Sequence, residues 1–180
     1  MTRSQFEHII RAASTIIEHN EIVTVGSQAI LGQFPNPPAQ CRRSMELDVF
    51  TMRAPSDADL IDGSIGEESP FHRTFGYWAH GIGIETVTLP ADWRSRAIRT
   101  SNANTLGSVA ISPEVHDLAV SKLAAGREKD LEYVRALIVV GLCQAEVIAD
   151  RIALVDTSDG LKKSMTFRLA RCQSDPAKME

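Results

Sequence analysis

Residues 21–31 read EIVTVGSQAIL, a pattern that predicts a strand, a tight turn and the start of a helix. The β-branched run of residues 21–25 is typical of a strand, and Gly26 permits the sharp reversal that ends it. Ser27 at a helix start leaves backbone N–H groups that favour an anion such as a phosphate. Gly26 and Ser27 are therefore candidate phosphate-binding residues, although a capped helix alone also explains the pair.

Residues 45–52, MELDVFTM, alternate in polarity as a strand does. Glu46 and Asp48 are expected on one face, with Cα atoms roughly 6.6 Å apart. Two carboxylates at this spacing can hold a divalent metal ion. A solvated acidic face is the structural alternative, but Phe50 and Met52 share the same face, which is therefore not simply polar.

The other segments extend this alternation of helices and strands. Apolar residues recur every three or four positions over residues 4–19, which predicts an amphipathic helix. Three prolines exclude regular structure from residues 32–43. The further expected elements are a short helix at 54–64, two short strands within 77–89, weak strands at 97–99 and 109–111, and helices at 113–126, 129–140, 144–155 and after 160.

The composition is that of a soluble globular protein. The chain has 180 residues, of which 43% are hydrophobic and 23% charged, with a formal net charge of -4. These values exclude collagen-like, disordered and disulfide-dense classes and argue against a protein that coats DNA or membranes. We expect no membrane segment and no secretory signal. Three cysteines without a CxxC pair favour a reducing cytoplasm.

A charged segment, SKLAAGREKD at residues 121–130, carries the last candidate site residues. Gly126 is expected to end one helix, and acidic residues such as Asp130 favour the beginning of the next. Lys122 and Arg127 would then be ordinary cations near helix ends. Taken singly, these residues indicate structure more than function.

The order of these motifs resembles that of the nucleotidyltransferase superfamily. More closely, the chain is similar to the AbiEii-type nucleotidyltransferase toxins and to the uncharacterised bacterial domains related to them. In that group a Gly-Gly or Gly-Ser turn precedes an Asp-x-Asp strand, and a helical motif with Lys, Arg and Asp follows. The corresponding stretches here are VGSQAI, SMELDVF and SKLAAGREKDLEYV, together with YWAHGIGIETVTLPADW.

The resemblance implies an α/β (α+β) fold, a mixed sheet flanked by helices and followed by a helical C-terminal part. The expected domains are a core at residues 1–112 and a helical part at 113–180. The resemblance also implies roles for individual residues. Gly26 and Ser27 would cradle the triphosphate of an NTP, and Glu46 and Asp48 would hold Mg²⁺ or Mn²⁺. Lys122 would neutralise phosphate charge, and Arg127 and Asp130 would line or brace the site.

The chain departs from the family pattern at the acidic residues. Glu46 stands where the family usually has Asp, and a longer side chain shifts the bound metal. The superfamily commonly uses a third acid on a neighbouring strand, and Glu85 is the candidate, with Asp92 behind it. The histidines have no spacing that favours a zinc site, although His80 neighbours the expected third strand.

The leading hypothesis is a cytoplasmic bacterial enzyme that moves a nucleoside monophosphate from an NTP to an RNA (tRNA) or protein acceptor. The family resemblance suggests a toxin with an antitoxin partner. An alternative is a catalytically degenerate module that binds a nucleotide or a protein through the same fold. A third hypothesis is a small-molecule nucleotidyltransferase with an acidic acceptor pocket, against which the arginines of residues 94–99 argue.

Overall fold

The computed structural model describes residues 1–173 and divides the chain into two compact units. The first unit comprises Met1–Val87 and Ala97–Pro113. The second joins Thr88–Arg96 to the chain from Glu114 onward. The predicted helical part extends to residue 180, so its last seven residues lie outside the described range.

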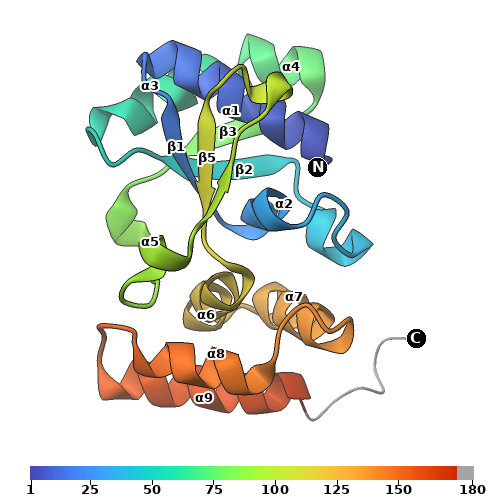
Figure 1. Ribbon diagram of the computed structural model, residues 1–180, viewed down its shortest axis with the longest axis vertical. Coiled ribbons are helices and arrows are strands. Elements are labelled where there is room, and N and C mark those ends of the chain that lie inside the picture. The colour runs from blue at the N-terminus through green and yellow to red at the C-terminus, as the bar shows by residue number, and fades with distance from the viewer. Residues whose placement is uncertain (174–180) are drawn as a thin grey trace. The chain divides into compact units, whose positions relative to one another are not determined.

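A five-stranded sheet forms the centre of the first unit (Figure 1). Its order is β3-β2-β1-β5-β4. The pairs β1–β2 and β4–β5 are antiparallel, whereas β1–β5 and β2–β3 are parallel, so the predicted mixed sheet is confirmed. The strands are β1 (Glu21–Val25), β2 (Glu46–Phe50), β3 (Trp78–Gly81), β4 (Ile98–Thr100) and β5 (Val109–Ser112).

Helices and short helical turns connect these strands. The predicted N-terminal helix is α1, which begins with a capping box between Thr2 and Gln5. The elements of this unit are α1 (Arg3–Ile17), η1 (Ser27–Ala29), α2 (Ile30–Gln33), η2 (Ala39–Arg42), α3 (Ser56–Ile65), α4 (Pro70–Phe75), η3 (Ile84–Thr86) and η4 (Ala103–Thr105).

Strand register separates the core face of β2 from its acidic face. Leu47 and Val49 are fully buried, and they pair with Ala79 and Gly81 of β3. A Cβ at Gly81 would overlap with the carbonyl oxygen of Ala58, so α3 packs closely on this face. Because successive side chains of a strand point to opposite faces, Glu46 and Asp48 lie on the face away from α3.

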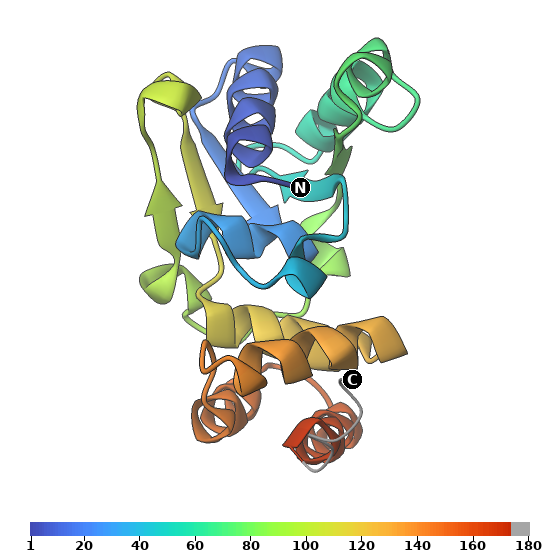
Figure 2. The ribbon, with the colours of Figure 1, turned by 90° about the vertical axis from the view of Figure 1, so that its right-hand side faces the viewer.

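The second unit is helical, as predicted for the C-terminal part. Its elements are α5 (Trp93–Arg96), α6 (Val115–Ala125), α7 (Glu128–Val139), α8 (Ala145–Ala153) and α9 (Asp159–Gln173). The helices α8 and α9 lie side by side in both views (Figure 1, Figure 2). Gly126, in the left-handed conformation with φ 68°, ends α6 as expected. Over residues 1–173, no helix is both long and apolar enough to cross a membrane.

Two local predictions were wrong or incomplete. Residues 77–89 form only the first of the two expected strands, because Ile84–Thr86 turn into a short 3-10 helix after Gly83. The helix α4 was not predicted, although Ser69 caps it and Pro70 begins it, which is a standard helix start. The proline-rich stretch at 32–43 holds no regular element longer than the single turn of η2.

Candidate metal and nucleotide site

Three ligand side chains converge on the acidic face of β2. Glu46 and Asp48 come from β2, and His80 comes from the parallel strand β3, where it pairs directly with Asp48. One ligand atom from each residue lies within 4.8 Å of the other two. His80 Nδ1 is 3.0 Å from Asp48 Oδ1 and 3.9 Å from Glu46 Oε1. We refer to Glu46, Asp48 and His80 as the acid–histidine group.

The electrostatics of the acid–histidine group reflect crowded negative charge. Burial, followed by the neighbouring charge of Asp48, raises the pKa of Glu46 above its usual range. Burial acts to lower the pKa of His80, but the hydrogen bond to Asp48 and the charges of Asp48 and Glu46 raise it overall. Both shifts indicate that a positive charge is favoured between the two carboxylates.

These donors fit a divalent cation. Carboxylate oxygens and an imidazole nitrogen are both established ligands of such ions, and three of them meet at one point. The side chains are between one quarter and one half exposed, so an ion can reach them from solvent. The sequence predicted two of these three residues, Glu46 and Asp48, as candidate ligands.

Gly26 ends β1 directly against this group. Val25 pairs with Asp48 in the sheet, and Gly26 follows with φ 68°, a conformation that favours glycine. A Cβ built on Gly26 would overlap with the Asp48 carboxylate. The Gly-Ser turn and the acidic strand, which the sequence presented as separate motifs, are therefore in contact.

Ser27 begins η1, the turn that leads into α2. The next residue, Gln28, is buried, and its side-chain amide donates a hydrogen bond to the carbonyl oxygen of Cys41 at 3.1 Å. This bond ties the proline-rich segment to the turn. The Gly26–Ser27 turn, which the sequence predicts to bind phosphate, therefore lies beside Asp48 and is followed by a residue that is anchored to Cys41.

Glu85, the predicted third acid, lies on η3 and is not a member of the acid–histidine group. It lines a cavity of about 500 Å³ that begins where β2 and β3 end. Asp59 also lines this cavity, as does Arg53, whose guanidinium is paired with Asp57. The role of Glu85 as a metal ligand stays a prediction.

Lys122, Arg127 and Asp130 form a compact network within the second unit. Asp130 is buried, and its carboxylate contacts Lys122 Nζ at 3.3 Å and Arg127 Nε at 2.6 Å. Burial opposes ionisation of Asp130, but the hydrogen bond to Arg127 and the charge of Lys122 lower its pKa overall. Lys122 also lies over the ring of Tyr133. The predicted motif is therefore a single ion-pair cluster, and its part in phosphate binding stays a prediction.

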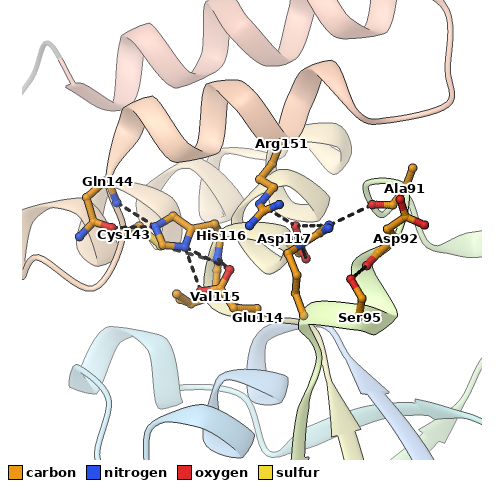
Figure 3. A network of polar contacts seen from close by, with 11 residues as sticks. Ala91, Asp92, Ser95, Glu114, Val115, His116, Asp117, Cys143, Gln144 and Arg151 are labelled. Atoms are coloured by element: carbon orange, nitrogen blue, oxygen red, sulfur yellow. Dashed lines mark hydrogen bonds and ion pairs between the residues drawn. The ribbon is translucent and has the colours of Figure 1, made fainter.

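A second polar network of this unit was not predicted (Figure 3). Asp117 is fully buried and accepts two hydrogen bonds from Arg96. Arg151 Nε lies 3.5 Å from Asp117 Oδ1. Arg96 is thus part of a buried ion pair and is unavailable as a simple surface cation. The sequence shows a polar helix position at 117 but does not show that it faces two arginines.

Next to it, His116 bridges Glu114 and Gln144 (Figure 3). The Nδ1 atom lies 2.9 Å from Glu114 Oε1, and Nε2 lies 2.9 Å from the side-chain oxygen of Gln144. The hydrogen bond to Glu114 is the main reason why the pKa of His116 is raised. This contact connects the first turn of α6 to the residue that precedes α8.

Comparison with known proteins identifies the chain at the level of the family. Searches among curated proteins and among solved structures find no match. The sequence model of the family described as "Nucleotidyltransferase of unknown function (DUF6036)" matches residues 4–171, which cover most of both units. The match supports the superfamily resemblance but does not extend to the AbiEii-type toxins in particular. The chain belongs to this nucleotidyltransferase family of unknown function.

Proposed function

We propose that the chain is a metal-dependent nucleotidyltransferase that moves a nucleoside monophosphate from an NTP to an RNA or protein acceptor. Family membership supports the reaction type. The observation that carries the proposal is the contact of Gly26 with Asp48 inside the acid–histidine group. It supports the proposal because the contact would bring a triphosphate on the turn next to a metal ion on the strand, as nucleotidyl transfer requires.

In this proposal the turn and the strand have different tasks. Gly26 and Ser27 hold the triphosphate beside the metal, because glycine lets the turn approach Asp48 without a Cβ that would displace its carboxylate. Glu46 and Asp48 hold Mg²⁺ or Mn²⁺. When bound, such an ion supplies charge stabilisation at the α-phosphate. The acceptor oxygen attacks the α-phosphorus, the bond to the β-phosphate oxygen breaks, and pyrophosphate leaves while the acceptor proton passes to solvent.

The acceptor and the biological role follow from the resemblance to toxin-like relatives. We propose an RNA such as tRNA, or a protein, as acceptor and an antitoxin protein as partner. Lys122 and Arg127 are proposed as cations for phosphate groups, with Asp130 bracing both, since the buried Asp130 carboxylate holds them together. Family membership supports a nucleotide substrate.

The test offers each α-labelled NTP in turn to the protein mixed with total cellular RNA and protein, with Mg²⁺ or Mn²⁺ present. Label on an RNA or protein band with the wild type, and none with Asp48→Ala, is the expected result. The labelled band identifies the acceptor class, and the active NTP identifies the base. Absence of label with every NTP would favour the alternative of a degenerate binding module.

A second candidate is transfer to a small cationic acceptor, and its support is the charge of the cavity, whose lining does not include the acid–histidine group. Asp59 and Glu85 line it, and neither forms an ion pair among residues 1–173, whereas the charge of Arg53 is balanced by Asp57. The cavity wall is therefore acidic, with apolar side chains such as Phe50 and Ile84 beside the carboxylates. Labelled products that appear with an aminoglycoside, and are lost in a Glu85→Gln and Asp59→Asn double variant, would support this candidate.

A further inference from the structure

His80 gives the metal site a nitrogen ligand that the acidic motif alone does not contain. Its Nδ1 atom is the point of closest approach to both carboxylates, at 3.0 Å from Asp48 and 3.9 Å from Glu46. Two ligand atoms on one ion at a bond length of about 2.1 Å are about 3.0 Å apart at a right angle and about 3.4 Å apart at a tetrahedral angle. The observed separations bracket these values closely enough for all three atoms to bind one ion after small side-chain rotations.

The backbone holds His80 in this place. The pairing of Asp48 with His80 is set by the parallel register of β2 and β3, and the N–H of Ile82 continues that pairing to Val49. On the outer edge of β3, the N–H of Gly81 donates to Asp62 of α3. The imidazole therefore belongs to a fixed strand, and its orientation toward the carboxylates does not depend on a mobile loop.

Ligand chemistry then distinguishes between metals. Mg²⁺ demands oxygen ligands and keeps most of its waters, whereas imidazole suits zinc, copper, iron and nickel ions. For a given set of nitrogen and oxygen ligands, affinity also rises from Mn²⁺ toward Cu²⁺. A site with two carboxylates and one imidazole is accordingly better matched to a transition metal than a site with three carboxylates.

We propose that Glu46, Asp48 and His80 together form a site for a divalent transition metal in preference to Mg²⁺, and Mn²⁺ serves as the spectroscopic probe of this site. The inference deepens the proposed function, on which its biological meaning rests, by naming the metal class and adding His80 as a ligand. The preference for a transition metal comes from His80, because its imidazole stands where a third carboxylate would otherwise complete the acidic site.

The experiment uses the metal-stripped full chain without nucleotide. Binding of Mn²⁺ and Mg²⁺ is measured by calorimetry, and pulsed electron paramagnetic resonance of the Mn²⁺ complex detects a directly bound nitrogen. We expect Mn²⁺ to bind at least about tenfold more tightly than Mg²⁺, and His80→Ala to remove the nitrogen coupling and most of that preference. His80→Asp should retain binding but shift the preference toward Mg²⁺.

His19→Ala is the matched control, because His19 lies outside the group and its loss should leave both affinities and the nitrogen signal unchanged. Circular dichroism of each variant confirms that it is folded. Equal affinities for the two ions, a Mn²⁺ complex without nitrogen coupling, or no binding of either ion would overturn the inference. If the metals bind as expected but no NTP supports transfer, the proposed function alone is overturned. If Mg²⁺ supports transfer and the Mn²⁺ complex shows no nitrogen coupling, the metal preference alone is overturned.

Discussion

The Cα atom of Gly26 lies so close to the Asp48 carboxylate that any side chain at position 26 would overlap with it. The two residues are 22 positions apart, yet the antiparallel pairing of β1 with β2 brings them together at the end of β1. The turn can approach the acid only because it carries no Cβ. Position 26 therefore requires glycine for two reasons, the steric contact with Asp48 and the positive φ of the backbone.

Gly26→Ala should lose metal binding as well as some stability. The φ of 68° costs an alanine about 1 kcal/mol, and the overlap additionally displaces Asp48. Gly76→Ala is the matched control, because Gly76 has φ 74° and open space around its Cβ position. Urea unfolding should show a loss of about 1 kcal/mol or more for both variants, with Mn²⁺ binding abolished only in Gly26→Ala. Normal metal binding by Gly26→Ala would show that the contact is dispensable.

Asp48→Ala should abolish transfer while leaving the fold almost as stable as before. In the absence of metal, the Asp48 charge repels Glu46 and contributes to the raised pKa of that residue. Its removal also loses the hydrogen bond with His80, so the two effects oppose each other. We expect a change in the free energy of unfolding within about 1 kcal/mol, measured in the metal-free protein. A variant that unfolds would instead assign Asp48 a structural role.

Asp117→Asn should be strongly destabilising. The carboxylate is fully buried and faces Arg96 and Arg151, so its neutralisation removes the carboxylate charge that pairs with Arg96 and leaves Arg151 only its interaction with Glu114. Loss of one member of such a buried network costs about 3–5 kcal/mol. As a control, Arg99→Ala removes only the exposed ion pair with Glu21 and should cost less than about 1 kcal/mol. Equal effects in chemical denaturation would show that the buried network contributes no more than a surface pair.

The His116 contact predicts a pH dependence of stability. The hydrogen bond to Glu114 raises the pKa of His116 above its ordinary value of 6.5, so the folded state keeps this proton to higher pH than the unfolded chain. The stabilisation is complete below pH 6.5 and is lost as the pH rises through the folded-state pKa. The difference in unfolding free energy between wild type and His116→Gln should therefore shrink as the pH rises above 6.5. A difference that does not vary with pH would contradict this account.

Much of the fold could be predicted because it is encoded locally. The three- and four-residue spacing of Phe6, Ile9 and Ile10 defines α1, and the β-branched run before Gly26 defines β1. Gly126 ends α6 as its conformational freedom suggests. By contrast, Ile84–Thr86 form the turn of η3 in place of an expected strand, and the β-branched pattern around Glu85 does not reveal this difference.

The candidate site was only partly predictable, since its remaining parts depend on pairing between distant strands. The spacing of Glu46 and Asp48 places them on one face from sequence alone. The role of His80 depends on the register between β2 and β3, residues 32 positions apart, and no local pattern specifies that register. The partners of Asp117 were hidden for the same reason, because Arg96 and Arg151 come from two other helices.

The central claim, nucleotidyl transfer, is tested most directly by comparing α-labelled with γ-labelled NTP in the presence of Mn²⁺ and of Mg²⁺. The wild type should place the α-label on an acceptor and release the γ-label as pyrophosphate, and Asp48→Asn should do neither. A γ-label on the acceptor, equal α-labelling by Asp48→Asn, or no transfer of either label would contradict the account.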